Sequence, residues 1–128
     1  MHLKILIVDD DPAMLSLYSR IFSDQDYNIT LANSFTAAAG LVKASRYDLL
    51  ITDLMLGDGL GTDLALLFAK ESPGAKAILV TGSLLETEDL DLSAFSVCLG
   101  KPLGIVNFIE VVAKTLSKPR VTDCCVLS

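Results

Sequence analysis

The chain has 128 residues, of which 52% are hydrophobic and 20% are charged, so its composition fits one folded domain with a packed core and excludes a disordered chain. The formal net charge of −6 argues against direct binding of nucleic acid by this domain, because phosphate contacts need clustered Lys and Arg. No apolar run approaches the ~20 residues that a membrane-spanning helix requires, so we expect no contact with a membrane.

Apolar runs and amphipathic segments alternate along the first half of the chain. Residues 3–8 form a nearly continuous aliphatic run, which is typical of a central strand buried on both faces. Asp11 and Pro12 suit the N-cap and the first position of a helix, and apolar side chains follow them at helical spacing. A short second strand is predicted over residues 28–32, and Ser34 can cap the helix that follows it.

The second half of the chain repeats this alternation. Further strands are predicted over residues 48–52, 77–81 and 95–99. Further helices are predicted over residues 62–71, 84–92 and 105–116. The segment 56–61 carries three glycines and is predicted to be a loop. Five strand–helix units result, and such an alternation predicts an α/β fold with a parallel sheet.

Polar side chains stand where the predicted strands stop. Asp9 and Asp10 follow the first strand, Asp53 follows the third, Thr81 ends the fourth, and Lys101 follows the fifth. In an open parallel sheet, ligands bind at the carboxyl ends of the strands. The strand ends could therefore bring three carboxylates, a hydroxyl and an ammonium into one crevice, which is the set of groups needed to hold a divalent metal and a phosphoryl group.

The three carboxylates predict a metal site. Two carboxylates at ~4 Å repel by about 1 kcal/mol in water and about 4 kcal/mol at an effective dielectric of 20, and a bound dication removes this cost. Oxygen ligands without His or Cys favour Mg²⁺. Asp53 could attack a phosphoryl group and form an aspartyl phosphate, while Lys101 neutralises charge and Thr81 donates a hydrogen bond. Helix capping alone is the alternative for Asp9 and Asp10.

In their order and spacing, four short motifs resemble those of a response-regulator receiver domain, the phosphoacceptor module of two-component signalling. The motifs are residues 5–12, 48–56, 80–82 and 101–102, and the resemblance covers residues 3 to about 117. The fold that it implies is a flavodoxin-like, doubly wound, five-stranded parallel sheet in strand order 2-1-3-4-5 with five helices. We expect residues 1–118 to be the receiver domain and residues 119–128 to be a tail or a truncated linker.

The resemblance also implies roles for individual residues. It implies that Asp53 is phosphorylated by a histidine kinase, a histidine phosphotransfer protein or a small phosphodonor. The Mg²⁺ ligands that it implies are Asp9, Asp10, Asp53 and the backbone carbonyl of Met55. It implies that Thr81 and Lys101 read the phosphoryl group and that the bond between Lys101 and Pro102 is cis. Such a domain is a switch rather than an enzyme, since it promotes only its own phosphorylation and dephosphorylation.

Three positions depart from the pattern of this family. Gly57 follows Leu56 where the family often has proline, and Gly82 follows Thr81 where it often has alanine. Cys98 stands where many receivers have Tyr or Phe, whose ring moves inward when the threonine engages the phosphoryl group. We expect Thr81 and Cys98 to be the switch positions, with the acceptor chemistry retained and the aromatic half of the switch missing. The output partner or domain is left open, and so is a homodimer.

Two alternative functions compete with this interpretation. A phosphatase of the haloacid-dehalogenase type also uses a strand-end Asp, and residues 9–11 superficially fit its first motif. That class needs Thr or Val where this chain has Ala13, and it needs an acidic pair after its lysine, where only Glu110 and Asp123 follow Lys101. The second alternative is a pseudo-receiver that has lost phosphorylation and acts only by binding, although all five pocket residues are present.

Cysteine usage indicates the compartment. The three cysteines, Cys98, Cys124 and Cys125, are an odd number and two are adjacent, so a disulfide framework is not expected. The chain also begins directly with its first strand, without the features of a secretory signal. We therefore expect a cytoplasmic location. Residues 125–128 fit a C-a-a-X prenylation box, with Cys124 as a second lipid site, but sparse upstream basic residues favour an incidental tail.

Overall fold

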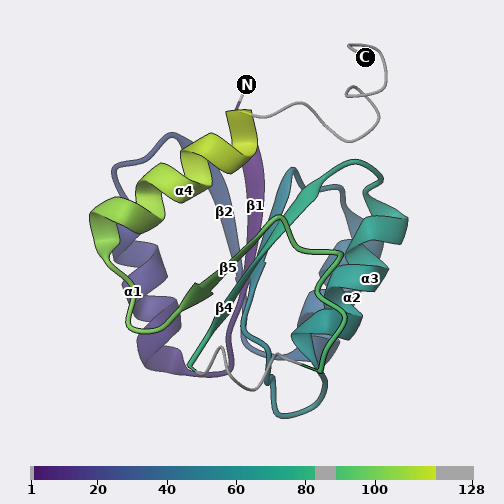
Figure 1. Cartoon of the computed structure of the whole chain (residues 1–128). Coiled ribbons are helices and arrows are strands. Elements are labelled where there is room, and N and C mark those ends of the chain that lie inside the picture. The colour runs from purple at the N-terminus through teal and green to yellow at the C-terminus, as the bar shows by residue number, and fades with distance from the viewer. Residues whose placement is uncertain (1, 83–88, 118–128) are drawn as a thin grey trace.

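The computed structural model describes residues 2–82 and 89–117 and arranges them in three layers, with a parallel sheet between two pairs of helices (Figure 1). The strand order is β2-β1-β3-β4-β5. The strands are β1 (Leu3–Val8), β2 (Tyr27–Ala32), β3 (Leu49–Thr52), β4 (Lys76–Thr81) and β5 (Val97–Gly100). The helices are α1 (Pro12–Phe22), α2 (Phe35–Ala44), α3 (Gly61–Glu71) and α4 (Ile105–Ser117). The predicted flavodoxin-like fold and its strand order are confirmed.

The number of helices differs from the prediction of five, because the described residues contain four. The predicted helix over residues 84–92 lies mostly outside the described residues, and its last part, residues 89–92, forms turns and irregular backbone. There the Asp91 carboxylate accepts a hydrogen bond from the Ser93 N–H at 3.0 Å. Such a local side-chain bond competes with the backbone bonds of a helix, which explains the difference for the described part.

The last strand is also shifted along the chain relative to the prediction. β5 begins at Val97 rather than at residue 95, because the Phe95 N–H donates to the Leu92 carbonyl at 3.0 Å and closes a turn. Pairing with β4 then starts through the Ser96 N–H, which donates to the Ala77 carbonyl at 2.8 Å. The strand extends to Gly100 and so brings the following lysine to the edge of the sheet.

Alternating side chains of the strands divide the core into two clusters. In β1, Leu6 and Val8 face the side covered by α2 and α3, whereas Ile5 and Ile7 face the side covered by α1 and α4 (Figure 1). On the α1 and α4 side, the rings of Tyr18, Phe22 and Phe108 pack together. The centroid of the Phe108 ring lies 5.7 Å from that of Tyr18 and 5.8 Å from that of Phe22. Both faces of the central strands are thus buried, as the continuous aliphatic run predicts.

Both predicted N-caps are confirmed. The Asp11 carboxylate accepts from the Ala13 N–H at 2.9 Å with Pro12 in the first turn of α1. The Ser34 hydroxyl accepts from the Ala37 N–H at 3.0 Å at the start of α2. Each cap satisfies an amide that has no partner within its own helix, so these two residues set where the chain leaves the sheet edge and turns into a helix.

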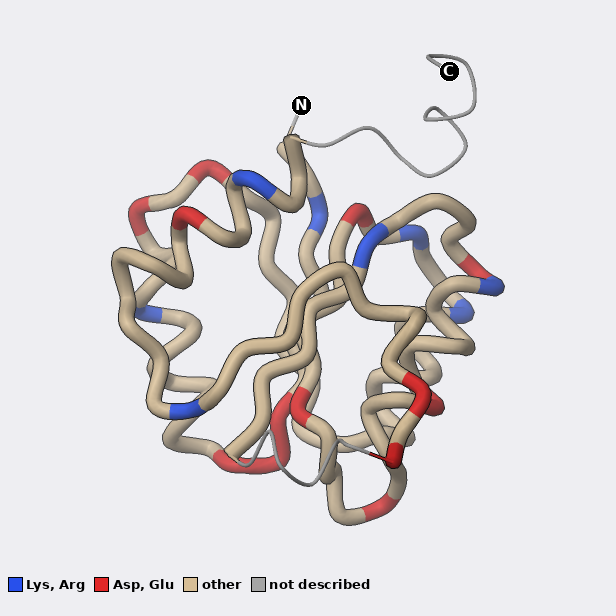
Figure 2. The backbone as a smooth tube through the Cα atoms, viewed as in Figure 1, with Lys and Arg blue, Asp and Glu red and all other residues tan. Residues whose placement is uncertain are grey.

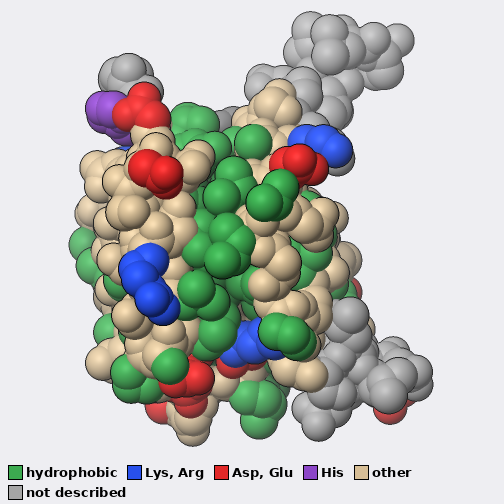
Figure 3. Space-filling view, turned by 90° about the vertical axis from the view of Figure 1, so that its left-hand side faces the viewer, with side chains coloured by type: hydrophobic (Ala, Val, Ile, Leu, Met, Phe, Trp, Pro, Cys, Tyr) green, Lys and Arg blue, Asp and Glu red, His purple; other side chains and the backbone are tan. Residues whose placement is uncertain are grey.

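The face formed by α1 and α4 carries a groove whose walls are partly apolar and partly polar, the polar residues being Arg20, Asp24 and Gln25. Figure 3 shows a band of hydrophobic side chains running down this face. Leu17 and Ile21 of α1 and Ile105 and Ile109 of α4 line the groove.

Across the part of the chain that the structure describes, no helix combines the length and the apolar character that crossing a bilayer would need.

Hydrogen bonding of the parallel sheet continues for one residue beyond several strands. The Asp9 N–H donates to the Ala32 carbonyl at 3.2 Å, and the Asp53 N–H donates to the Val8 carbonyl at 3.1 Å. The Lys101 N–H donates to the Thr81 carbonyl at 2.8 Å. Asp9, Asp53 and Lys101, three of the residues that the sequence places after strands, are therefore held at one edge by the sheet itself.

Candidate functional site

The acidic residues of this edge converge on one point. Asp9, Asp10 and Asp53 each offer one carboxylate oxygen, and these atoms all lie within 4.8 Å of one another. Figure 2 shows acidic residues gathered at the lower end of the sheet, where β1 and β3 end. Asp9 is 1% exposed, Asp53 is half-buried and Asp10 is exposed, so the cluster opens to solvent on one side.

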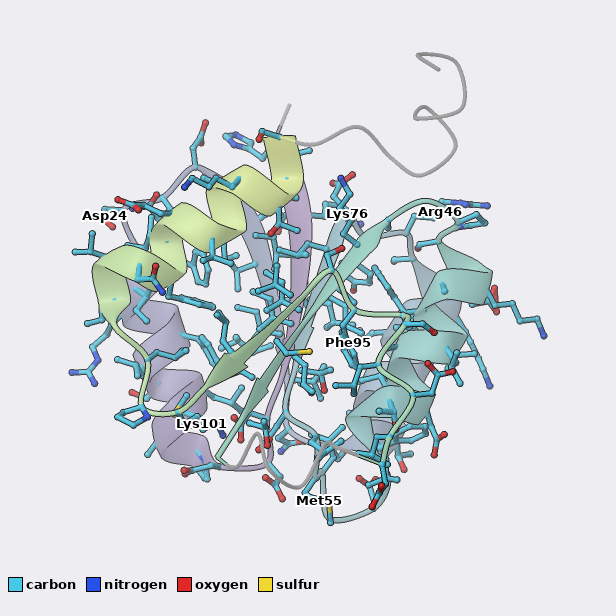
Figure 4. All side chains as sticks on the ribbon, in the orientation of Figure 1. Asp24, Arg46, Met55, Lys76, Phe95 and Lys101 are labelled. Atoms are coloured by element: carbon cyan, nitrogen blue, oxygen red, sulfur yellow. The ribbon has the colours of Figure 1, made fainter. Side chains whose placement is uncertain are left out.

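Lys101 completes the cluster by contacting two of these carboxylates. Its Nζ lies 3.0 Å from Asp9 Oδ2 and 3.1 Å from Asp53 Oδ2. Figure 4 labels this side chain at the end of β5, where the predicted cis bond to Pro102 is confirmed. Burial lowers the pKa of the Lys101 ammonium, but the hydrogen bonds and charges of Asp9 and Asp53 outweigh burial and raise the pKa above its usual value.

Asp9 lies under opposing influences. Burial raises the pKa of its carboxyl above the usual value, and the charge of Asp53 adds to that rise. The Asp11 N–H, which donates to Asp9 Oδ1 at 2.9 Å, and the Lys101 ammonium both lower the pKa, without cancelling the effect of burial. The charges of Asp9 and Asp53 also act on the buried Tyr18. Burial is the main reason that the pKa of its phenol is raised, and the two negative charges raise this pKa further.

Asp53 is oriented by its neighbours in the chain. Its Oδ1 accepts from the Leu54 N–H at 2.7 Å, while its Oδ2 lies toward Lys101. Its carbonyl accepts from the Thr52 hydroxyl at 2.9 Å. A Cβ at Gly61 would overlap the Asp53 carbonyl oxygen, so the start of α3 packs directly on the backbone of this carboxylate. The rotation of the Asp53 side chain is therefore restricted, and one of its oxygens faces the cluster.

The loop after Asp53 is closed by its own backbone. Met55 and Leu60 form an antiparallel bridge, in which the Leu56 N–H donates to the Gly59 carbonyl at 3.0 Å and the Gly61 N–H donates to the Leu54 carbonyl at 2.7 Å. These bonds use other carbonyls, so within the described part of the loop they leave the Met55 carbonyl available as a ligand. The Met55 side chain is 58% exposed beside the site (Figure 4).

Thr81 and Cys98 are the two predicted switch positions. Thr81 is 3% exposed at the end of β4, and its carbonyl accepts the Lys101 N–H, so its hydroxyl-bearing side chain is at the same sheet edge as the cluster. Cys98 lies in β5 and pairs with Leu79 of the neighbouring strand β4. Its thiol is half-buried, and burial raises the pKa of this thiol. Among the described residues, the group whose side chains could hold a metal ion does not include Cys98.

One residue of this region was missed by the sequence analysis. Asp58, in the glycine-rich loop, accepts hydrogen bonds from the Phe35 N–H at 2.8 Å, the Thr36 N–H at 3.0 Å and the Thr36 hydroxyl at 2.8 Å. These bonds hold the Asp53 loop against the first turn of α2. The only sequence feature that could have indicated this role is an Asp between two glycines, which by itself is typical of any turn.

The donor set fits Mg²⁺. Magnesium takes oxygen ligands at about 2.1 Å in octahedral geometry and usually keeps several waters, so it needs few protein ligands. Three carboxylate oxygens within 4.8 Å of one another, with an available backbone carbonyl nearby in the loop, meet that need. Repulsion among the carboxylates is relieved in part by Lys101 and would be relieved further by a dication.

One protein family matches this chain over most of its length. The response regulator receiver domain family matches residues 5–113. The response regulator protein PilR of Pseudomonas aeruginosa is 31% identical over 116 residues, which cover 88% of this chain and 26% of PilR. The curated relatives are longer proteins, and the alignments cover between 17% and 39% of their lengths.

Solved structures agree with the family match. The CheY-like response regulator receiver domain protein from Methanospirillum hungatei JF-1 superposes with a TM-score of 0.84 at 30% identity, covering 91% of this chain and 94% of that chain. The response regulator protein TrrA from Thermotoga maritima, solved in complex with Mg²⁺ and beryllium fluoride, superposes with a TM-score of 0.81 at 27% identity, covering 88% of this chain and 98% of that chain.

Proposed function

The chain belongs to the response regulator receiver domain family, whose members accept a phosphoryl group in two-component signalling, and we propose that Asp53 is the residue that accepts it here. The observation that carries this proposal is the geometry around Asp53. Its Oδ2 lies 3.1 Å from the Lys101 ammonium, and an oxygen of its carboxylate lies within 4.8 Å of ligand atoms of Asp9 and Asp10. Family membership argues against the phosphatase alternative.

In the proposed reaction, a carboxylate oxygen of Asp53 forms a bond to phosphorus while the bond between phosphorus and the donor breaks. The donor is a phosphohistidine of a kinase or phosphotransfer protein, or a small acyl phosphate, and its leaving group departs with the bonding electron pair. The Leu54 N–H holds one oxygen of Asp53, which limits the rotation of the carboxylate. Catalysis of this step is mostly positioning and electrostatic stabilisation.

Three further residues stabilise the transferred group. Lys101 supplies a positive charge beside Asp53, and the Thr81 hydroxyl at the same sheet edge supplies a hydrogen-bond donor to a phosphoryl oxygen. The proposed Mg²⁺ ligands are Asp9, Asp10, Asp53 and the Met55 carbonyl. When bound there, Mg²⁺ supplies a positive charge that neutralises the phosphoryl oxygens.

We further propose that the phosphorylated domain acts as a switch and not as an enzyme on other molecules. Thr81 and Cys98 are the proposed switch positions. The proposed partners are a histidine kinase or histidine phosphotransfer protein and an output partner or domain, with homodimerisation still a prediction. The proposed domain spans residues 1–118, and residues 119–128 are a tail or linker. The odd number of cysteines supports a cytoplasmic location.

The proposal is tested by measuring the intact mass after incubation with Mg²⁺ and acetyl phosphate. We expect the parent protein to gain one phosphoryl group and Asp53→Ala to gain none, because Asp53 combines its contact with Lys101 with partial exposure to solvent, whereas Asp9, which also contacts Lys101, is buried. Asp63→Ala is the matched control, since Asp63 is an exposed acid in the first turn of α3. Equal gain by the Asp53→Ala protein, or no gain by the parent, would overturn the assignment.

A further inference from the structure

The loop after Asp53 is attached to α2 by one side chain. Both oxygens of Asp58 are used: Oδ1 accepts from the Phe35 N–H at 2.8 Å, and Oδ2 accepts from the Thr36 N–H at 3.0 Å and the Thr36 hydroxyl at 2.8 Å. These are the first two residues of α2, where amides lack helical partners and the helix dipole favours an anion. The bonds from Thr36 and then from Phe35 lower the pKa of Asp58.

The glycines on either side of Asp58 fit closely against their surroundings. Gly59 lies under the Phe35 ring, and a Cβ there would stand 2.6 Å from ring carbons. Gly57 has φ of 73°, and a Cβ there would stand 3.4 Å from Oδ2 of Asp10, a proposed metal ligand. The tip of the loop is therefore held between the acid cluster on one side and the start of α2 on the other.

The same short loop carries the Met55 carbonyl. Its base is closed by the bridge between Met55 and Leu60, and within its tip the Asp58 N–H donates to the Leu56 carbonyl at 2.7 Å. These bonds connect the tip of the loop to its base. We therefore expect a shift of Asp58 relative to α2 to reach the Met55 carbonyl.

From this arrangement we infer that Asp58 is a positioning residue of the metal site: docked on Phe35 and Thr36, it holds the loop that carries the Met55 carbonyl against the acid cluster, where these groups would hold the ion. This inference rests on the proposed function of the same site. Asp58 touches neither the metal nor the phosphoryl group, and it acts only through the loop. Residues that orient metal ligands without binding the metal commonly change metal affinity by about 10- to 100-fold when mutated.

The test measures the dissociation constant for Mg²⁺ by calorimetry in the full chain. Two substitutions form a matched pair, because Asp58→Ala and Asp63→Ala each remove one exposed carboxylate near the Asp53 loop. We expect Asp58→Ala to weaken Mg²⁺ binding about tenfold and Asp63→Ala to weaken it at most about twofold. Thr36→Ala removes one of the three donors to Asp58 without changing charge, and we expect it to weaken binding about two- to threefold.

A second measurement separates positioning from loss of the fold. Phosphorylation of Asp58→Ala by acetyl phosphate should slow at low Mg²⁺ and return to the parent rate at saturating Mg²⁺, since the Asp53 and Lys101 contacts stay intact. Amide hydrogen exchange at Leu56 and Gly61 should become faster in this variant. A rate that stays low at saturating Mg²⁺ would mean general damage to the site and would contradict the inference.

The Mg²⁺ affinities and the phosphorylation of the parent together distinguish a failure of the positioning role from a failure of the proposed function. Equal Mg²⁺ affinities of Asp58→Ala and Asp63→Ala, in a parent that is phosphorylated on Asp53, would overturn the positioning role alone. A parent that binds Mg²⁺ but gains no phosphoryl group would overturn the proposed function, and the affinity ratio between the two variants would still decide the role of Asp58. A parent that binds no Mg²⁺ would overturn both.

Discussion

Asp9 is a residue at which stability and the proposed function oppose each other. Its carboxylate is 1% exposed, and burial raises its pKa despite hydrogen bonds from the Asp11 N–H and Lys101. A pKa above the unfolded value means that the folded state binds the proton more tightly than the unfolded chain does. The ionised Asp9 therefore costs stability, and this cost grows as the pH rises from about 4 through the folded pKa.

Replacing this carboxylate by a neutral isostere should stabilise the fold and weaken the metal site. We expect Asp9→Asn to raise the free energy of unfolding at pH 7 by about 1 kcal/mol, because the neutral amide avoids the cost of burying a charge and the repulsion by Asp53. The gain should shrink as the pH falls toward 4, because the raised pKa of Asp9 favours its neutral form in the folded state. Urea titrations at about pH 4 and pH 7 measure the gain at both conditions.

Asp10→Asn is the control for this prediction. Asp10 belongs to the same cluster but is exposed, so we expect its substitution to change stability by less than about 0.5 kcal/mol. Both variants should lose Mg²⁺ affinity. Equal or lower stability of Asp9→Asn relative to the parent at pH 7 would show that its bonds with Lys101 outweigh the cost of burial, contrary to our expectation.

At the scale of elements, α2 and α3 differ in how they tolerate a methyl group at a glycine. Gly40 is exposed in the interior of α2, and a Cβ there would have no atom within 4 Å. Gly61 begins α3 on top of the Asp53 carbonyl, which a Cβ would overlap. The first glycine serves no packing purpose that the structure shows, whereas the second allows the helix to start directly at the phosphoacceptor loop.

These two glycines give opposite predictions for the same substitution. Gly40→Ala should raise the free energy of unfolding by about 1 kcal/mol, because alanine restricts the unfolded chain and favours the helix. Gly61→Ala should lower it by about 1 to 3 kcal/mol, as is typical of overpacking, and should slow phosphorylation because the Asp53 backbone must move.

Denaturant unfolding and the rate of phosphoryl gain check both variants. The phosphorylation rate of Gly40→Ala should equal that of the parent, since the hydrogen bonds from α2 to Asp58 come from its first turn and Gly40 lies on the exposed side of the helix. Unchanged stability and rate in Gly61→Ala would mean that α3 can shift away from Asp53 at little cost, which would contradict the close packing described here.

At the scale of the whole molecule, the parallel sheet brings together groups that are far apart in sequence. Lys101 is 92 residues from Asp9 and 48 residues from Asp53, yet its Nζ contacts both carboxylates. A ligand that binds this site would contact the ends of β1, β3, β4 and β5 together. Binding should therefore stabilise the entire domain and not only one loop.

Beryllium fluoride with Mg²⁺ should raise the thermal unfolding temperature, because it mimics a phosphoryl group on an aspartate. At ligand 100-fold above its dissociation constant, linkage adds about 2.7 kcal/mol, which corresponds to roughly 10 °C for a domain of this size. Differential scanning calorimetry measures the shift, and Mg²⁺ alone serves as the reference for each protein.

Asp53→Ala should lose the shift caused by beryllium fluoride, since the mimic needs the carboxylate oxygen. The parent experiment also separates a phosphoacceptor from a pseudo-receiver. If the unfolding temperature of the parent does not change with beryllium fluoride, the pocket residues are present but do not act together, and a domain that signals only by binding would be the better interpretation.

The sequence by itself determined the layers and most of the site. Continuous aliphatic runs such as residues 3–8 encode buried parallel strands, and caps such as Asp11 and Ser34 encode helix starts, because both depend on neighbours within a few residues. Polar residues directly after these runs must reach the carboxyl edge of the sheet. Convergence of Asp9, Asp10 and Asp53 on one point was therefore predictable, and the structure confirms it.

Only the tertiary structure decided which of these groups pair. The sequence does not show that Lys101 bridges Asp9 and Asp53, or that Asp58 docks on Thr36 across 22 residues, because such pairs depend on sheet register and loop path. The turn of residues 89–92, predicted as helix, is a local example in which a side-chain bond outcompetes helical periodicity. Short-range patterns specify the elements, whereas long-range contacts exist only after the sheet has assembled.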